Sequence, residues 1–220
     1  MKHRNLLILG ASGGVGKWAV KIAKERGYKI TVIVRSKASF ENSEGIHVIE
    51  GNVLDNDVLE KAVQGQDAVL SCLGIKRKNQ ANPWSVIVSP TDFTEMVMKN
   101  TITIMENKGI HRLVTVSAAG VGDSWSSVSS FMKFMIASSN IKHAYKDFDN
   151  MEKRLKNSKI DSLSVRPVGF IDAEPTNKTQ LVNQFNISTR ISKSDVAKWM
   201  VNALEREERF EKPTEMIGWV

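Results

Sequence analysis

Four glycines near the start of the chain have a spacing suited to binding a phosphate group. They are Gly10, Gly13, Gly14 and Gly16, in the stretch ILGASGGVGKW that covers residues 8–18. A P-loop, the phosphate-binding loop of NTPases, ends in Gly-Lys-Ser/Thr, because its lysine reaches the outer phosphates and its hydroxyl binds magnesium. Here Trp18 stands at the hydroxyl position and Ala11 at the position of the first glycine, so the pattern excludes an NTPase site.

The same stretch fits the glycine turn of a dinucleotide-binding fold. Such a turn needs a tight bend after a strand, a close backbone approach to the pyrophosphate, and a helix that begins at the phosphate. An apolar run at residues 6–9 precedes the glycines, and a helical pattern follows them. An ordinary strand-to-helix turn is the alternative. The residues expected to contact the cofactor are Gly10, Ser12, Gly13, Gly14, Val15 and Gly16.

Arg35 indicates which dinucleotide the site prefers. A site that prefers NAD usually ends its second strand with Asp or Glu, which binds the 2′-hydroxyl of the ribose. Here the second predicted strand, residues 29–34, is followed by Arg35 and Ser36. A guanidinium can bind the 2′-phosphate of NADP with two hydrogen bonds. We therefore expect NADP(H) to be preferred over NAD(H), with a solvated basic residue as the alternative.

Residues at two further strand ends are expected near the cofactor. Asn52 and Val53 follow the third predicted strand, where a short polar turn can contact the edge of the adenine. Asp55, in the same turn, is equally suited to capping the helix predicted from residue 56.

The fourth predicted strand leads into Cys72, Leu73 and Gly74, whose backbone groups are expected to line the ribose beside the nicotinamide. Cys72 is either a redox sensor or a small buried core residue, and buried thiols commonly take the second role.

The composition is that of an ordinary globular protein with a basic surface. The chain has 220 residues, of which 41% are hydrophobic and 25% charged, and a formal net charge of +7. A basic protein favours anionic ligands. The basic residues are dispersed and no nucleic-acid-binding module accompanies them, so no specific nucleic acid is expected. No apolar segment has the length of a membrane span, and the four histidines lack metal-ligand spacing. The single cysteine excludes an internal disulfide and is compatible with a cytoplasmic location.

The elements that must position these residues alternate between strand and helix, as in a parallel sheet covered on both faces. The predicted strands are residues 5–9, 29–34, 46–50, 68–72, 112–117, 162–166 and a short one at 215–219. The predicted helices are residues 17–26, 56–64, 91–108, 131–138, 144–157 and 193–207. These elements predict an α/β Rossmann-type doubly wound sheet with strand order 3-2-1-4-5-6 and a short seventh strand. We expect one domain over residues 1–220.

Three long connections interrupt the alternation, at residues 74–90, 118–130 and 167–186. Ligands bind at the carboxyl ends of the strands in such sheets, so these connections are expected to contact the substrate. Aromatic rings in or beside them can stack on a planar acceptor or pack as a lid, and they are Trp84, Trp125, Phe131 and Phe134.

Several motifs together resemble an atypical short-chain dehydrogenase/reductase. They are GASGGVG at 10–16, VR at 34–35, GNVLD at 51–55, VSAAG at 116–120, VRP at 165–167 and ISKSDVA at 191–197. The chain is similar to the NAD(P)H-binding group that includes flavin reductase/biliverdin-IXβ reductase and NmrA-like proteins. The resemblance implies the Rossmann fold, places Pro167 with the cofactor, and assigns Ser117 to the serine that ends strand five in the flavin reductase group. A catalytic histidine of that group falls here on Glu152.

The Tyr-x-x-x-Lys pair of the broader superfamily is missing, because Tyr145 is followed four residues later by Asp149. Hydride transfer without that pair suits an easily reduced acceptor that takes its protons from solvent. We expect an NADPH-dependent reductase of a small planar acceptor of the flavin, quinone or tetrapyrrole type, with Ser117 and Glu152 as candidate catalytic residues. The alternative is a non-catalytic, NADP(H)-binding redox sensor of the NmrA type. A monomer or a weak homo-oligomer without a membrane or nucleic-acid partner is expected.

Overall fold

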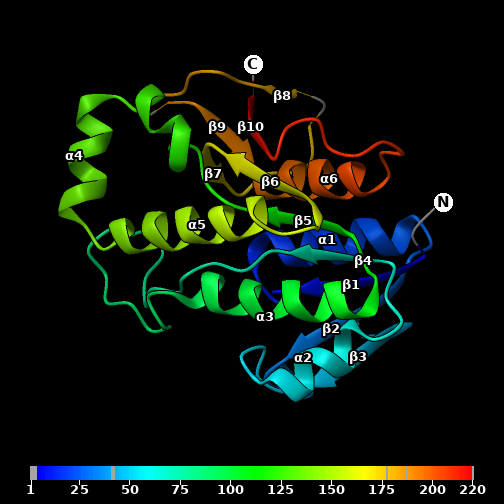
Figure 1. Ribbon diagram of the computed structural model, residues 1–220. Helices are drawn as coiled ribbons and strands as arrows, with labels where there is room; N and C mark the ends of the chain where they lie inside the picture. The colour runs from blue at the N-terminus through cyan, green and yellow to red at the C-terminus, as the bar shows by residue number, and fades with distance from the viewer. Residues whose placement is uncertain (1–3, 41–42, 177, 187, 220) are drawn as a thin grey trace.

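The computed structural model describes residues 4–40, 43–176, 178–186 and 188–219. Its centre is one eight-stranded sheet with the order β3-β2-β1-β4-β5-β6-β10-β8 (Figure 1). Seven of these strands are parallel, and only β8 is antiparallel to its neighbour. The order 3-2-1-4-5-6 with a further parallel strand is therefore confirmed. Bounds of the sheet strands are β1 Asn5–Leu9, β2 Lys29–Val34, β3 Ile46–Glu50, β4 Ala68–Ser71, β5 Arg112–Val116, β6 Asp161–Pro167, β10 Thr214–Trp219 and β8 Thr179–Leu181.

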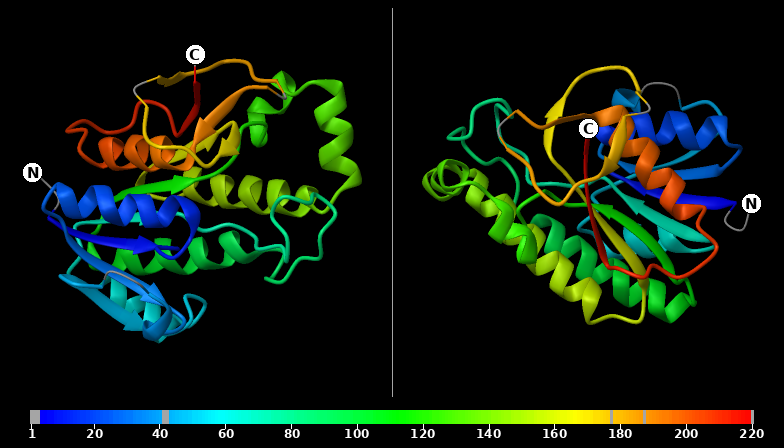
Figure 2. Two further views of the ribbon diagram at one scale, coloured as in Figure 1. Left: turned by 180° about the vertical axis from the view of Figure 1, so that it is seen from behind. Right: turned by 90° about the horizontal axis from the view of Figure 1, so that it is seen from above.

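Helices cover both faces of this sheet, as predicted. One face carries α1 and α6, and the other carries α2, α3 and α5 (Figures 1 and 2). The α-helices are α1 Gly14–Glu25, α2 Asn56–Val63, α3 Phe93–Lys108, α4 Ser130–Ser138, α5 Ile141–Lys156 and α6 Lys193–Leu204. Two short 3₁₀ helices, η1 Lys37–Ser39 and η2 Gly122–Ser127, lie in connections.

The central strand β1 shows why its sequence is apolar without alternation. Leu6 and Ile8 belong to the core on the α1 and α6 side, whereas Leu7 and Leu9 belong to the core on the α2, α3 and α5 side. Successive side chains of a strand point to opposite faces, so a strand covered on both faces needs apolar residues at every position. All four leucine and isoleucine side chains are fully buried, and each such burial contributes about 1.5–3 kcal/mol.

Helix ends follow the capping signals of the sequence. Gly27 and Gly109 have φ values of 77° and 69°, the left-handed conformation that glycine commonly adopts just beyond a helix, here α1 and α3. Ser192 accepts a hydrogen bond on its Oγ from the backbone N of Asp195 at 3.0 Å and caps α6. Some predicted bounds are wrong by three residues: α1 and α5 begin three residues earlier than predicted, and α6 ends at Leu204.

The predicted irregular segment 167–186 contains extended structure instead. A two-stranded parallel ribbon pairs β7, Gly169–Ile171, with β9, Arg190–Ser192, and β8 adds an antiparallel edge to β10. Each of these strands has three residues, too few to show a hydrophobic period, so their pairing depends on the sheet already in place. Among the described residues, no helix combines the length and the apolar character that crossing a membrane requires.

Candidate functional site

The glycine turn joins β1 to α1 and leaves the first backbone N–H groups of that helix without a side-chain cap from any described residue. Gly10 has a φ of 78°, and its carbonyl oxygen accepts a hydrogen bond from the backbone N of Gly13 at 2.9 Å. Gly13 is the N-cap of α1, and within the described residues no side chain caps the helix and no acidic residue lies in its first turn. The first N–H groups of a helix point along its axis and attract anions. This helix start can therefore receive a phosphate.

Two glycines of the turn are required by its packing. A Cβ atom on Gly16 would stand 2.1 Å from the carbonyl oxygen of Gly10, far inside van der Waals contact. A Cβ on Gly10 would stand 2.9 Å from the carbonyl oxygen of Cys72, which follows the neighbouring strand β4. The bend is thus tight both against itself and against β4, and only glycine fits at either position.

The carboxyl ends of the parallel strands bring the other predicted cofactor residues to the same edge of the sheet. Arg35 follows β2 and is exposed, and Ser36 beside it precedes η1. Cys72 donates its backbone N–H to the carbonyl of Leu9 at 2.8 Å, which places the end of β4 against the glycine turn. The remaining residues at this edge are Ser12 in the turn, Leu73 and Gly74 after β4, Ser117 after β5 and Pro167 at the end of β6.

The turn after β3 satisfies its own polar groups. Asn52 accepts the backbone N–H of Leu54 on its side-chain oxygen at 3.0 Å. Asp55 accepts the backbone N–H of Asp57 at 3.0 Å and is the N-cap of α2. Of the two roles considered for Asp55, the structure therefore shows the helix cap. Asn52 is exposed and Val53 is half-buried.

Burial raises the pKa of the Cys72 thiol well above its usual range. The thiolate is the reactive form of cysteine, and a raised pKa keeps the thiol protonated at neutral pH. Of the two roles considered for Cys72, packing is favoured over redox sensing, because the half-buried side chain packs against the core on the α1 and α6 side.

Ser117 is the buried hydroxyl of the site. Its backbone N donates to the carbonyl of Val165 at 2.7 Å, which fixes the residue at the mouth of β5. The residue is 2% exposed, and its Oγ has no hydrogen-bond partner among the described residues. A buried hydroxyl without a partner costs about 1–3 kcal/mol. An orphan polar atom at this edge fits a bound ligand that supplies the missing hydrogen bond.

Glu152 of α5 forms an ion pair with Arg166 of β6. Its two carboxylate oxygens accept from Nε and Nη2 of Arg166 at 3.0 and 2.6 Å, and Arg166 also contacts Asp123 at 2.5 Å. Glu152 and Arg166 are both buried. The sequence did not predict this pair, because the two residues lie on different elements and β6, with the sequence DSLSVRP, mixes polar and apolar residues.

Tyr145 on α5 reaches the site but holds its proton. Its phenol donates to the carbonyl oxygen of Ala119 at 2.9 Å, and burial raises its pKa to about 12. The Trp125 and Tyr145 rings form a T-shaped pair, with their centroids 6.2 Å apart. Because proton transfer is efficient only when the pKa of the donor lies near the working pH, this phenol is poorly suited to donate a proton.

We expect Tyr145→Phe to retain most of any hydride-transfer activity toward a flavin, quinone or tetrapyrrole. The substitution removes the hydrogen bond to Ala119 but no group that titrates near neutral pH, so the pH profile between pH 6 and 9 should keep its shape. Steady-state oxidation of NADPH across that range is the measurement. Abolished turnover with an unchanged cofactor dissociation constant would show that Tyr145 acts directly in the reaction.

Exposed aromatic side chains lie beside this edge. The aromatic rim consists of Trp84, Trp125, Phe131 and Phe134, which are between 38% and 67% exposed. Trp84 belongs to the predicted connection 74–90, which forms a small hairpin through an antiparallel bridge between Arg77 and Ile87.

The hairpin is attached to the junction of α4 and α5. Nε1 of Trp84 donates to the carbonyl of Ser138 at 3.1 Å, and Nδ2 of Asn140 donates to the carbonyl of Trp84 at 3.1 Å. Figures 1 and 2 both show the hairpin and α4 at the same end of the molecule. The connection 74–90 is therefore attached to the helix pair that follows the connection 118–130, and the exposed rings of Trp84, Phe131 and Phe134 lie on these joined segments.

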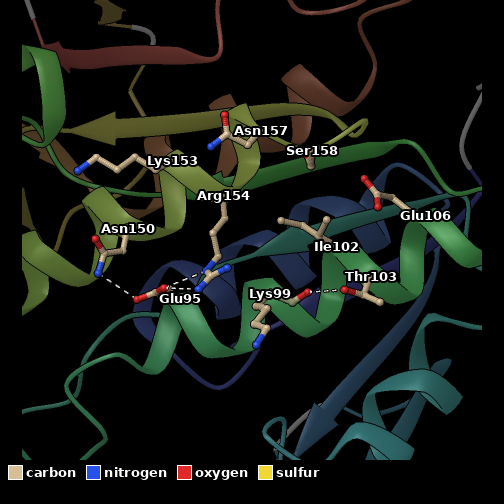
Figure 3. Close-up of a pocket in the computed structure, with 10 residues that line it drawn as sticks. All are labelled: Glu95, Lys99, Ile102, Thr103, Glu106, Asn150, Lys153, Arg154, Asn157 and Ser158. Carbon is tan, nitrogen blue, oxygen red and sulfur yellow. Dashed lines mark hydrogen bonds and ion pairs between the residues drawn. The ribbon is translucent and has the colours of Figure 1, made fainter.

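A separate polar groove of about 530 Å³ lies between α3 and α5 (Figure 3). Glu95 is its centre, accepting from Arg154 at 2.6 Å and from Asn150 at 3.0 Å. None of the predicted cofactor residues lines this groove. Glu95 and Arg154 form an ion pair inside it, and the groove is distinct from the strand-end site.

The sequence of this chain is similar to those of known NAD(P)H-binding proteins. A family described as NAD(P)H-binding matches residues 10–207. The chain is similar to divinyl chlorophyllide a 8-vinyl-reductase, chloroplastic, of Arabidopsis thaliana, with 26% identity over 131 residues, which cover 53% of this chain and 30% of that protein. It is also similar to photosystem II assembly factor Ycf39 of Synechocystis, with 24% identity, which covers 97% of this chain and 62% of that protein. The chain thus spans less than two thirds of either relative.

Solved structures share the fold. ChuY, described as an anaerobilin reductase from Escherichia coli O157:H7, superposes with a TM-score of 0.78 and 21% identity over 97% of this chain and 96% of that one. A wide-type short-chain dehydrogenase/reductase from Veillonella parvula in complex with NADP gives a TM-score of 0.76 and 18% identity over 98% and 94% of the two chains.

Proposed function

The chain belongs to the NAD(P)H-binding family, and on that premise we propose that it is an NADPH-dependent reductase of a small planar acceptor. The observation that carries the proposal is the orphan hydroxyl of Ser117, buried at the mouth of β5 on the edge where the glycine turn lies. A structural serine at a strand end would satisfy its hydroxyl within the protein. A serine that binds a ligand leaves the hydroxyl for that ligand.

In this proposal, each residue at the strand ends binds a different part of the cofactor. The start of α1 receives the pyrophosphate, and Arg35 binds the 2′-phosphate. Backbone groups of Cys72, Leu73 and Gly74 line the ribose, and Ser117 hydrogen-bonds the carboxamide or the acceptor. The cofactor itself supplies the hydride, and the protein supplies its position relative to the acceptor.

We place the acceptor against the aromatic rim and favour a tetrapyrrole over the other planar classes. Two similar proteins, the chlorophyllide vinyl-reductase and ChuY, have names that describe the reduction of such molecules. Flat aromatic side chains pack well on a flat conjugated ring system. Lys76 and Lys78 of the hairpin are exposed, and their charges suit an acceptor that carries carboxylates. A conjugated acceptor takes its proton from solvent. It therefore does not need the phenol of Tyr145, which is hydrogen-bonded to Ala119.

The test is anaerobic NADPH oxidation with FMN, a quinone, and a linear and a cyclic tetrapyrrole, each with native protein and with Ser117→Ala. We expect turnover with at least one tetrapyrrole and a loss of about tenfold in Ser117→Ala, for one hydrogen bond to a reacting group. The control is Thr179→Val, which removes another buried hydroxyl without a described partner, on the edge strand β8. Turnover that is equal in Ser117→Ala and in the native protein would remove Ser117 from the mechanism.

A non-catalytic NADP(H) sensor is the second candidate, and one observation favours it. Both titratable side chains considered for proton transfer are held elsewhere, Tyr145 by Ala119 and Glu152 by Arg166. A protein of this kind would bind NADPH and NADP⁺ with different affinities and reduce none of the four acceptors. Titration of both cofactor forms beside the same acceptor panel separates the two functions.

We expect Arg35→Asp to remove the preference for NADP(H). The native protein should bind NADPH more tightly than NADH, and the substitution should weaken NADPH binding by about 1–3 kcal/mol, the range of a charge-assisted hydrogen bond, while leaving NADH nearly unchanged. Fluorescence titration of both cofactors is the measurement. Lys29→Asp is a matched control, because it makes the same change of charge at the opposite end of the same strand. Equal affinities of the native protein for NADPH and NADH would contradict the role of Arg35.

A further inference from the structure

Lys193 lies across the glycine turn, although it is 177 positions away from Gly16 in the chain. It is the first residue of α6, the helix that packs beside α1 on the same face of the sheet (Figure 1). A Cβ atom on Gly14 would stand 2.7 Å from Cδ and 3.3 Å from Nζ of Lys193. The lysine therefore occupies the space that a side chain on Gly14 would take, with its ammonium beside the first residue of α1.

The partner of this ammonium is exposed. Nζ of Lys193 forms an ion pair with Oδ1 of Asp172 at 2.7 Å, and the Asp172 side chain is 84% exposed. Asp172 directly follows β7, the ribbon strand that pairs with β9, and β9 leads into α6. A salt bridge to so exposed a carboxylate contributes little to stability and is readily exchanged for a stronger anion.

We propose that Lys193 is a cofactor-binding residue, which leaves Asp172 and binds the pyrophosphate of NAD(P)H at the start of α1. The proposal rests on cofactor binding by the family and does not require the reductase activity. The pyrophosphate carries two negative charges and is held by the N–H groups of α1, so the ammonium beside Gly14 meets more negative charge there than on Asp172. Asp172 then acts as a competing anion that holds the lysine over the turn before the cofactor binds.

The position of Lys193 predicts a pattern different from that of Arg35. NADP(H) and NAD(H) share the pyrophosphate and differ only in the 2′-phosphate. Lys193 lies at Gly14, whereas Arg35 lies at the end of β2. Loss of the Lys193 charge should therefore weaken the binding of both cofactors by the same factor. Adenosine 2′-phosphate, which has no pyrophosphate, should bind as it does to the native protein.

The experiment measures dissociation constants of NADPH, NADH and adenosine 2′-phosphate by calorimetric titration, for native protein, Lys193→Met and Asp172→Asn. We expect Lys193→Met to raise the dissociation constants of NADPH and NADH about tenfold each, the effect of losing one charge-assisted contact. Asp172→Asn should lower the dissociation constants of both cofactors, because it removes the competing anion. Lys29→Met is the control for the change in net charge, and thermal unfolding verifies that each variant is folded. Ser192 and its capping hydrogen bond remain in every variant.

Unchanged affinity of Lys193→Met for NADPH and NADH would overturn the proposal, and so would a loss confined to NADPH, which would place the lysine at the 2′-phosphate. Weaker or unchanged binding by Asp172→Asn would overturn the role of Asp172 as a competitor. These readouts need no acceptor. A protein that reduces none of the acceptors but shows the expected affinities would contradict the reductase function and leave the role of Lys193 intact.

Discussion

Glu152→Ala is expected to lower the free energy of unfolding by about 3–5 kcal/mol, the effect of breaking a buried ion pair by removing one partner. Arg166 is only 5% exposed, and Glu152 supplies two of its three ionic hydrogen bonds. The remaining partner, Asp123, has a side chain that is 82% exposed. The substitution would therefore leave a buried guanidinium with one solvent-screened contact. Urea unfolding followed by circular dichroism is the measurement.

Two further variants separate structure from catalysis at this position. Asp123→Ala removes the exposed partner of Arg166 and should cost much less, because exposed ion pairs contribute at most about 1 kcal/mol. Glu152→Gln keeps the shape and one acceptor oxygen, so its loss of stability should lie between those of the two alanine variants. If Glu152→Ala unfolds like the native protein but loses turnover, the carboxylate acts on the substrate rather than on Arg166.

Gly16→Ala is expected to have the second large effect, on both stability and cofactor binding. The new methyl would stand 2.1 Å from the carbonyl oxygen of Gly10, so the backbone of the turn must move. Overpacking of this kind costs about 1–3 kcal/mol, and more where backbone rather than a flexible side chain must give. The displaced turn would no longer aim the N–H groups of α1 at the pyrophosphate, and we expect NADPH affinity to fall at least about tenfold, the loss of a charge-assisted contact.

Gly74→Ala is the control for Gly16→Ala. Its methyl would meet only Cζ of Phe148, at 3.6 Å, which is ordinary van der Waals contact. Its free energy of unfolding should therefore stay close to that of the native protein. Thermal unfolding of both variants provides the comparison of stability, and NADPH titration compares Gly16→Ala with the native protein. Native-like NADPH affinity in Gly16→Ala would show that the turn does not hold the cofactor.

Much of the fold could be predicted because its signals are local. The bounds of β1, β2 and β3 agree with the prediction. β1 and β2 are apolar runs, and β3 is a short segment that contains Ile46, Val48 and Ile49 before the turn at Gly51. Gly27, Gly109 and Ser192 mark helix ends through the conformation or the hydroxyl that a cap requires. The strand order followed from the regular alternation of strands and helices. The resemblance to NAD(P)H-binding proteins is confirmed over residues 10–207, because a phosphate-binding turn needs glycines at fixed spacing.

Only the tertiary structure determines which side chains from distant parts of the chain contact one another. Glu152 and Arg166 lie on different elements, and nothing in the local sequence of either shows that they form a buried pair. Lys193 lies on Gly14 only because α6 packs beside α1. The short strands β7, β8 and β9 exist because neighbouring strands offer them hydrogen bonds. A sequence pattern records backbone preference and the period of burial within one segment, whereas the partner of a side chain depends on how distant segments pack.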